Sequence, residues 1–530
     1  MTRGAVTPRV ESDARDRSFS LALSWRASLV LLGACALAAG MAIIDSYPVG
    51  VFHDDSMYVI LARSLATGQG YRYLNLPGAP VATHFPPGYP ALLALVWRVM
   101  PSFPANVVVF KAMNAVFLCA SALLVAQLVR DRLGSERWAF GVGIVSAVSV
   151  PLLVLATMVL SEPLFLALLL AVLVCAERIV ARPAASRQAL TLGVCIGVLA
   201  LVRSHGIVAL PAVALPLLVH RRWRDTALMA AGTLAVVLPW QLWSARHADA
   251  LPAPLLGNYG SYAGWWIRGF REMGPAMIPA TLAKTVPETA AMLAALFSPI
   301  RGAAAHVVTL LALGGLFTTG ALALRTRAPV TLLFLAGYSA IVLVWPFPPS
   351  RFFWGVWPLL LLLLAAAGWS NAPANRVRHS LARLSVAAML AWVAVGFGAY
   401  EVRAVRGSWW ASISRAAVRR IEPAIMWTLA NTAPEDVIAA DDEGAVFLYT
   451  GRRAVPVAAF TTGHYLLNRS AAVEASEGLV PLLETFPLRA VLVGSSKTFD
   501  AAQYLASQPR PMLSLREQFS GGAAFTVLSR

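Results

Sequence analysis

Two adjacent carboxylates, Asp54 and Asp55, follow the first long apolar run of the chain, within the stretch VFHDDSMYVILARSLATGQG. A carboxylate can take a proton as a general base, and it can also help to hold a cation. Met57, Ile60 and Leu61 follow helical spacing, which predicts an amphipathic helix able to lie on a membrane surface. Asp54 would be the N-cap of this helix and Asp55 would lie in its first turn. Capping alone would therefore account for both acids.

Three further charged residues stand beside apolar segments. Glu162 follows Ser161 in SEPLF, Arg203 lies in LVRSHG, and Arg351 lies in PFPPSRFFWG. The planar donors of arginine bind phosphate well, so Arg203 and Arg351 are candidates for holding a phosphorylated ligand. The alternatives are a capped helix start at Glu162, snorkelling of Arg203 to lipid headgroups, and an aromatic belt around Arg351.

The remaining polar candidates carry weaker signals. Arg268 and Lys284 lie in a long connection and could close over a ligand, as flexible lids do. His53, His84 and His247 do not have the spacing of a known metal cluster, and a plain polar role explains them as well.

The composition indicates that these residues belong to an integral membrane protein. The chain has 530 residues, of which 58% are hydrophobic and 13% are charged, and its mean hydropathy is +0.67. The net charge of +17 comes from arginines between apolar runs rather than from a basic face with stacking aromatics, which argues against nucleic acid as a partner. All four cysteines fall within apolar runs, so no disulfide framework or cysteine metal site is indicated.

Hydropathy predicts about eleven transmembrane helices, because a bilayer crossing needs roughly 20 apolar residues. The predicted ranges are 27–47, 105–129, 138–158, 162–180, 188–202, 205–220, 226–244, 304–324, 328–346, 352–369 and 381–400. Arginines gather at alternate junctions, so the positive-inside rule predicts a cytoplasmic N-terminus and an outer C-terminus. These arginines are Arg3, Arg9, Arg15, Arg17, Arg26, Arg130, Arg132, Arg137, Arg178, Arg182, Arg187, Arg325, Arg327, Arg376, Arg378 and Arg383, with the HRRWR stretch. The first run could also be a signal peptide, but its length favours an uncleaved span.

Three larger pieces are then predicted outside the membrane. Residues 1–400 would form the membrane domain, with outer loops at 48–104 and 245–303, and residues 401–530 would form a separate outer domain. In that tail, EDVIAADDEGAVFLYTGRRAVPV, LRAVLVGSSKTFDAAQYLASQ and AAFTVLSR alternate strand-like and helix-like patterns, which predicts a small α/β domain. The segment VGSSKTFD lacks phosphate-loop spacing, so no nucleotide site is expected there.

The first outer loop resembles that of membrane glycosyltransferases with the C-type fold, which include protein O-mannosyltransferases, lipid A aminoarabinose transferases and a rhizobial galacturonosyltransferase-like group. The resemblance lies in an acidic pair followed by Tyr, an Ala-x-x-Leu-x-x-Gly segment and a Pro-Pro-x-Gly-Tyr segment. The matching residues are Asp54, Asp55, Tyr58, Ala62, Leu65 and Gly68, followed by Pro86, Pro87, Gly88 and Tyr89. His84 and Phe85 stand where aminoarabinose transferases have a Glu-Lys pair, which counts against that subfamily and leaves the donor phosphate needing another cation.

The resemblance implies an inverting glycosyltransferase that moves a sugar from a polyprenyl-phosphate donor to a glycan, lipid or protein acceptor outside the cytoplasm. Asp54 would be the general base, and Asp55 would position the site or bind a divalent cation, with His53 as a second possible ligand. The residues expected around the donor phosphate are Arg203, Arg351, Glu162, Tyr58 and His84. The sequence leaves the cofactor unknown, with a divalent cation as one possibility.

The sequence as a whole therefore predicts a polytopic all-α protein of the bacterial inner membrane with a small C-terminal α/β domain. A transporter or flippase for a lipid-linked substrate is the alternative function, although it would place its charges near the bilayer midplane. A non-catalytic assembly scaffold that uses the tail to bind partners is a second alternative.

Overall fold

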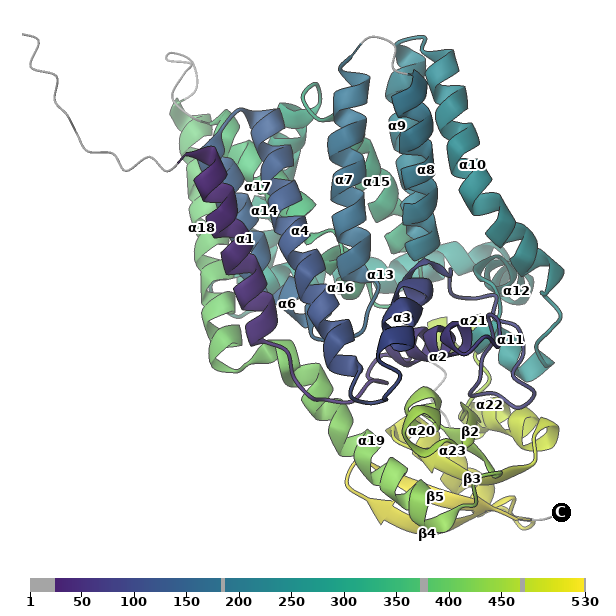
Figure 1. Cartoon of the computed structure of the whole chain (residues 1–530). Helices are drawn as coiled ribbons and strands as arrows, with labels where there is room; N and C mark the ends of the chain where they lie inside the picture. The colour runs from purple at the N-terminus through teal and green to yellow at the C-terminus, as the bar shows by residue number, and fades with distance from the viewer. Residues whose placement is uncertain (1–23, 183–185, 372–379, 468–471, 529–530) are drawn as a thin grey trace, which may run out of the picture.

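The computed structural model describes residues 24–182, 186–371, 380–467 and 472–528. Long helices form a bundle, and a small sheet with its own helices lies beyond one end of that bundle (Figure 1). Within the described part of the chain, six helices are long and apolar enough to cross a membrane, or seven if the bent pair α5 (Glu136–Val148) and α6 (Val150–Ala156) is one span. The six are α1 (Trp25–Ala42), α4 (Val107–Leu133), α7 (Glu162–Val180), α10 (Trp223–Arg246), α14 (Ala303–Leu324) and α18 (Ser380–Arg406).

The other predicted spans are helical but shorter. They correspond to α8 (Ser186–Val202), η1 (Ser204–Val208) with α9 (Ala209–Val219), α15 (Pro329–Val344) and α17 (Trp357–Ser370). A helix of 14 to 17 residues falls below the roughly 20 that a full crossing needs. The chain is thus a mostly helical, multi-pass membrane protein, and the count of eleven crossings stays a prediction.

Small residues allow the helices of the bundle to approach closely. A Cβ atom added at Gly193 of α8 would lie 2.0 Å from the carbonyl oxygen of Met229 in α10, and one at Gly232 of α10 would lie 2.6 Å from the carbonyl oxygen of Leu190. Helices in lipid associate through such close backbone contacts, because the hydrophobic effect does not drive apolar helices together there.

Further helices, most of them short, cover the bundle end that faces the sheet (Figure 1). They are α2 (Asp54–Ala66), α3 (Gly88–Val99), η2 (Ala253–Leu255), α11 (Leu256–Tyr259), α12 (Tyr262–Met273), η3 (Gly274–Ala276), α13 (Met277–Phe297) and α16 (Pro349–Trp354). The predicted helix after the acidic pair is α2, and protein rather than solvent or lipid covers most of its surface. Residues 55–62 are all buried, because α3 and a helix of the C-terminal domain, α20 (Glu443–Thr450), pack against it.

The C-terminal domain is a five-stranded sheet with helices. Its strands are β1 (Val437–Ala440), β2 (Arg453–Pro456), β3 (Leu488–Val493), β4 (Leu513–Phe519) and β5 (Gly522–Val527), and they lie in the order β2-β1-β3-β5-β4. The first three strands are parallel, whereas β5 is antiparallel to β3 and β4. The helices besides α20 are α19 (Ser412–Asn431), α21 (Thr462–Leu466), α22 (Ala472–Thr485) and α23 (Ser496–Ala506). The α/β arrangement agrees with the sequence pattern, which did not predict β4.

The connection between the two parts is helical except for a turn at Gly407 and Ser408. The predicted domain boundary at residue 401 lies within α18, and the short η4 (Trp409–Ala411) joins α18 to α19. Figure 1 shows α19 running from the bundle to the sheet.

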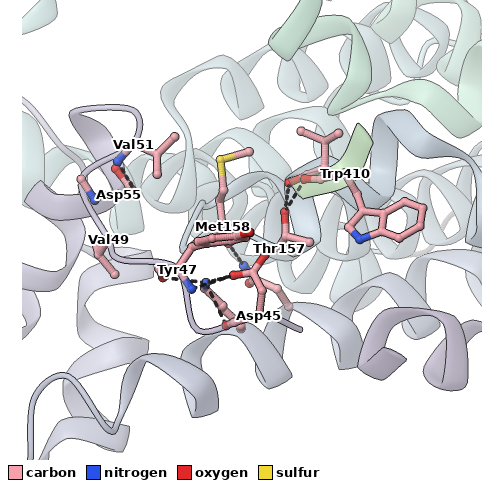
Figure 2. Close-up of polar contacts among 12 residues, drawn as sticks. Asp45, Tyr47, Val49, Val51, Asp55, Thr157, Met158 and Trp410 are labelled. Carbon is pink, nitrogen blue, oxygen red and sulfur yellow. Dashed lines mark hydrogen bonds and ion pairs between the residues drawn. The ribbon is translucent and has the colours of Figure 1, made fainter. Parts of the chain in front are cut away.

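Buried polar contacts hold the loop between α1 and α2. The ammonium group of Lys111, a buried residue of α4, lies 2.6 Å from Oδ1 of Asp45 and donates to the carbonyl oxygens of Asp45 and Tyr47. At the other end of the loop, the carboxylate of Asp55 accepts hydrogen bonds from the backbone N–H groups of Gly50, Val51 and Phe52. Figure 2 shows both groups of contacts. The backbone immediately before Asp54 is thereby fixed in position.

This loop also contacts the C-terminal domain. The hydroxyl group of Tyr449 accepts a hydrogen bond from the N–H of Val49 at 3.0 Å. Gly50 has φ +112°, and a Cβ atom placed there would lie 2.5 Å from Cβ of Ala445 in α20. Glycine is required at this position both for its backbone angle and for the close approach of α20.

We expect Gly50→Ala to destabilise the docking of the C-terminal domain more than Gly70→Ala does. Both glycines have positive φ, but nothing lies within 4 Å of a Cβ atom at Gly70. The collision with Ala445 should cost about 1–3 kcal/mol beyond the shared backbone strain. Thermal unfolding in detergent and limited proteolysis of the C-terminal domain measure this difference. An equal loss of stability in the two variants would contradict the close contact between Gly50 and Ala445.

Candidate functional site

A cavity of about 540 Å³ lies where the bundle meets the outer helices and the C-terminal domain. The predicted residues Asp54, Tyr58, His84, Arg203 and Arg351 all line it, as does His53. Tyr58 and Asp54 come from the first two turns of α2, Arg351 comes from α16, and Arg203 lies between α8 and η1. These side chains come from four separate parts of the chain.

Glu162 joins the two arginines of the cavity. Its Oε2 lies 2.9 Å from Nη1 of Arg203, and its Oε1 binds Nε of Arg351. Nη2 of Arg351 lies 2.8 Å from Oδ2 of Asp54. Alternating charges thus run from Arg203 through Glu162 and Arg351 to Asp54, and the four formal charges sum to zero.

Exposure is lowest at Glu162 and increases from there through Arg351 to Asp54. The side chain of Glu162 is 1% exposed and that of Arg203 is 9% exposed, whereas the values are 15% for Arg351 and 29% for Asp54. Glu162 is therefore the buried anchor of the arginines, and Asp54 is the carboxylate that a ligand in the cavity can reach.

Ser161 and Tyr58 lie beside Arg203, and of these two Tyr58 lines the cavity. The Ser161 hydroxyl accepts a hydrogen bond from Nη1 of Arg203 at 3.0 Å and lies 3.0 Å from the hydroxyl of Tyr58. The guanidinium of Arg203 also lies over the ring of Phe352, and that of Arg351 over the ring of Phe52. Packing and hydrogen bonding therefore hold both arginines in place before any ligand binds.

Asp54 is held in its charged form. Removal from water pushes the pKa of this carboxyl up, but the positive charges of Arg351, His53 and Arg203 outweigh that effect and hold its pKa below the ordinary value. Asp54 is also the first residue of α2, so it lies at the positive end of the helix dipole. The N-cap position belongs to His53 rather than to Asp54 as predicted.

Asp55 has a different environment from Asp54. Its side chain is 1% exposed and does not line the cavity, and both of its oxygens accept backbone N–H groups of the preceding loop. Burial raises the pKa of this carboxyl, and the hydrogen bonds from Gly50, Phe52 and Val51 oppose the rise. In this arrangement Asp55 positions the loop that carries Asp54.

His84 is a neutral, fixed group in the cavity wall. Its Nδ1 lies 2.6 Å from the carbonyl oxygen of Gly260, and its ring packs 4.3 Å from the ring of Tyr262. Burial lowers the pKa of His84 to about 4 despite the Gly260 carbonyl and Asp54, so it carries no charge at neutral pH.

His53 links the cavity to the C-terminal domain. Its Nδ1 lies 3.2 Å from Oε1 of Glu443, a 2% exposed residue at the start of α20. The same oxygen accepts a hydrogen bond from the hydroxyl of Tyr259 at 2.7 Å, and that hydroxyl accepts one from the amide of Asn75. Burial alone would lower the pKa of His53, but Glu443 and the neighbouring aspartates outweigh it and raise the pKa to about 8.

The sequence analysis missed Glu443 and Tyr259. The acidic run DDE directly after β1 was the available signal, since polar residues at the carboxyl ends of parallel strands often form sites. Nothing in the sequence pairs that run with His53, which lies 390 residues earlier.

Aromatic side chains form much of the wall of the cavity. Those lining the cavity are Phe52, Tyr58, Tyr262, Trp265, Trp345, Phe347, Phe352, Trp354 and Phe460. Arg268 instead donates to the carbonyl oxygen of Leu256, Lys284 packs over the ring of Tyr465, and His247 bonds the carbonyl oxygen of Trp243. None of these three lines the cavity, so the structure does not bring them together with Asp54.

The residues around Asp54 do not form an evident metal site. Among the described residues, no group of three or more His, Cys, Asp or Glu side chains could hold a metal ion. The oxygens of Asp55 are taken by backbone N–H groups, and Nδ1 of His53 faces Glu443. The permanent positive charge in the cavity comes from Arg203 and Arg351, and His53 adds to it when protonated.

Solved structures with the same fold are membrane glycosyltransferases. ArnT from Cupriavidus metallidurans bound to undecaprenyl phosphate, a lipid A aminoarabinose transferase, has a TM-score of 0.57 and 16% identity, covering 94% of this chain and 97% of ArnT. The archaeal oligosaccharyltransferase AglB from Archaeoglobus fulgidus, in complex with an inhibitory peptide and a dolichol-phosphate, has a TM-score of 0.53 and 11% identity, covering 95% of this chain and 74% of AglB.

Two more structures of the Archaeoglobus fulgidus oligosaccharyltransferase have the same fold. One is tethered to an acceptor peptide, with a TM-score of 0.54, 13% identity and coverage of 88% and 68% of the two chains. The other holds Zn and sulfate, with a TM-score of 0.53 and 14% identity. Comparison with protein-family models gives no match, and neither does comparison with curated protein sequences. The chain therefore has the C-type glycosyltransferase fold, which confirms the resemblance predicted from its first outer loop.

We expect the contact between His53 and Glu443 to make stability depend on pH. Because the pKa of His53 is raised from 6.5 to about 8, the protonated ring stabilises the folded chain fully below pH 6.5. That contribution is lost as the pH rises through 8. Glu443→Gln should therefore flatten the decline of the thermal midpoint between pH 6.5 and 8.5.

Glu477→Gln is the matched control for this measurement. Glu477 lies 3.5 Å from His464 in the same domain, but its side chain is 59% exposed. This control should keep the pH dependence of the parent. A parent midpoint that does not fall over this range would refute the assignment to His53.

Proposed function

We propose that the chain is a glycosyltransferase that moves a sugar from a polyprenyl-phosphate donor to a hydroxyl group of an acceptor, with inversion at the anomeric carbon. The observation that supports this most directly is the cavity in which an accessible carboxylate, Asp54, stands beside two arginines. The shared fold of ArnT bound to undecaprenyl phosphate and AglB bound to dolichol-phosphate supports the class of donor.

Arg203 and Arg351 would bind the donor phosphate. Arginine presents several N–H donors in a plane and remains charged at any physiological pH, which suits it to a phosphate that leaves with negative charge. Tyr58 and His84 would line the space beside the phosphate, and Glu162 would position both guanidinium groups without touching the donor.

Donor binding would also activate the base. In the ligand-free structure Arg351 neutralises Asp54 and lowers its pKa, which makes the carboxylate a weak proton acceptor. A phosphate that binds Arg351 competes for its positive charge, so the proton affinity of Asp54 rises when the donor is present. Asp54 would therefore become an effective base only beside a bound donor.

The proposed step has one bond formed and one broken at the anomeric carbon. The acceptor oxygen attacks this carbon while Asp54 takes the proton of the hydroxyl group. The bond between carbon and phosphate oxygen breaks, and the electron pair leaves with polyprenyl phosphate beside Arg203 and Arg351. Attack from the face opposite the phosphate inverts the carbon.

The acceptor would enter from the side of the C-terminal domain. A second cavity of about 380 Å³ lies there and shares His53, Asn258 and Phe460 with the first. In-line attack requires the acceptor and the leaving phosphate on opposite sides of the sugar, and the two arginines lie on the bundle side. The glycan, lipid or protein nature of the acceptor is left open by this geometry.

We also propose the bacterial inner membrane as the location, with eleven crossings, a cytoplasmic N-terminus and the site outside. The arginine-rich ends of α4 and α7 lie at the bundle end away from the sheet (Figure 1), which supports this orientation by the positive-inside rule. A transporter of a lipid-linked substrate is the second candidate. The charged groups gather at one end of the bundle rather than at its middle, which favours the enzyme.

Asp54→Asn should abolish sugar transfer while the protein still binds undecaprenyl phosphate. Removal of a general base lowers rates by about 10²–10⁴-fold, because the acceptor must then lose its proton unassisted. Transfer is measured in membranes that contain a labelled lipid-linked sugar, and binding is measured separately. Asp249→Asn, outside the cavity, is the control. Parental transfer by Asp54→Asn would rule out this base.

Arg351→Gln should lower transfer by about 10²–10³-fold and shift the acid limb of the pH profile. Arg351 holds the pKa of Asp54 down, so Asp54 of the parent stays ionised to low pH. The value of kcat/KM should therefore stay high over the same range. Without Arg351 the pKa of Asp54 rises. When the pH is lowered, kcat/KM of the variant should therefore begin to fall at a higher pH than that of the parent. Arg271→Gln, an exposed arginine of α12, should leave the limb in place. An unshifted limb in Arg351→Gln would refute the coupling.

A further inference from the structure

A groove of about 560 Å³ runs between α7 and α8, at the bundle end away from the sheet. Its walls are mostly apolar, with Leu168, Val172 and Ile179 from α7 facing Leu192, Cys195 and Val198 from α8. The groove is open along its length, since Cys175, Cys195 and Val198 are exposed in the folded chain. An exposed apolar groove within the membrane part of the bundle faces lipid.

Arginines surround one end of this groove. Arg178 lies in the last turn of α7, Arg182 lies just beyond that helix, and Arg187 lies in the first turn of α8, and all three line the groove. Gln188 and Thr191 add polar groups at the same end. The groove is therefore apolar along its length and basic at its mouth.

The nearby acids do not neutralise this end. Asp131 binds Nε and Nη2 of Arg178, and Asp225 binds Arg222 and accepts a hydrogen bond from Ser186. Arg222 in turn donates to the carbonyl oxygens of Ile179 and Arg182, which fixes the end of α7.

Two positive charges remain at the mouth. Both acids are engaged, and within the described residues neither Arg182 nor Arg187 has a carboxylate within ion-pair distance. Both side chains are exposed, so they are free to turn toward a ligand at the mouth.

We propose that this groove binds an anionic phospholipid from the leaflet on that side of the membrane. The headgroup phosphate would lie between Arg182 and Arg187, and an acyl chain would occupy the groove between α7 and α8. Charge complementarity argues for this occupant, because basic pockets between membrane helices bind anionic headgroups. A zwitterionic lipid would fill the groove equally well, but its headgroup cation would offset the charge of its phosphate and weaken the attraction to both arginines.

This site is separate from the cavity that contains Asp54. The two share no lining residue, and they lie at opposite ends of α7. The inference does not rest on the proposed function, so a failure of sugar transfer would leave it standing.

The test compares phosphatidylglycerol with phosphatidylcholine. The purified full-length protein is mixed with equal amounts of the two lipids in detergent, and the bound lipids are counted by native mass spectrometry. The parent should retain phosphatidylglycerol in preference to phosphatidylcholine. R182Q/R187Q should reduce retention about thirtyfold, because one arginine near an anionic lipid contributes about fivefold to binding.

R137Q/R325Q is the matched control. It removes the same charge from two exposed arginines that lie outside the groove, at the start of α5 and the end of α14. This control should bind phosphatidylglycerol as the parent does.

R182K/R187K keeps the positive charge at both positions and should retain most of the binding. Retained binding in this variant would show that the loss in R182Q/R187Q comes from the lost charge and not from misfolding.

Three outcomes would overturn the proposal. The parent could bind both lipids equally, which would show that the groove does not select for an anionic headgroup. The control could lose as much binding as R182Q/R187Q, which would assign the effect to overall charge. R182Q/R187Q could retain phosphatidylglycerol, which would place the lipid elsewhere.

Discussion

The buried carboxylate of Glu162 is the interaction on which the geometry of the cavity depends. It binds two arginines that come from distant parts of the chain, Arg203 and Arg351, and it is itself 1% exposed. Removing one partner from such a buried cluster leaves an uncompensated charge, which typically costs about 3–5 kcal/mol. Glu162 therefore fixes both guanidinium groups relative to α7, and Arg351 in turn places Asp54. A single buried acid thus sets the position of Arg203 and Arg351 directly and of Asp54 through Arg351.

The C-terminal domain is part of this arrangement rather than an appendage. Its helix α20 packs against Gly50, and its residue Glu443 binds His53 next to Asp54. The loop before α2 is thus held from two sides, by Lys111 and Asp55 from the membrane part and by Ala445 and Tyr449 from the domain. A rigid backbone before Asp54 holds its carboxylate within ion-pair distance of Arg351.

Local sequence patterns predicted much of this structure, but not its long-range pairings. The helix after the acidic pair has clear periodicity, yet its burial depends on α20, which lies almost 400 residues later. The strand β4 escaped prediction because most of its residues are exposed, as expected of a charged edge strand. Arg203 and Arg351 stood out because charge is rare beside apolar segments. Their common partner Glu162 could be explained equally well by helix capping, so only the structure shows what it binds.

The link between His53 and Glu443 has a consequence for biosynthesis. Ribosomes deliver the chain from its N-terminus, so α2 and most of the bundle exist before α20 has been made. Until Glu443 emerges, the wall beside Asp54 lacks one side and the loop at Gly50 lacks its cover. A truncated or stalled product would therefore hold the four charges of the cluster but not the closed chamber around them. Late completion of this kind delays full assembly of the cavity until nearly the whole polypeptide has been synthesised.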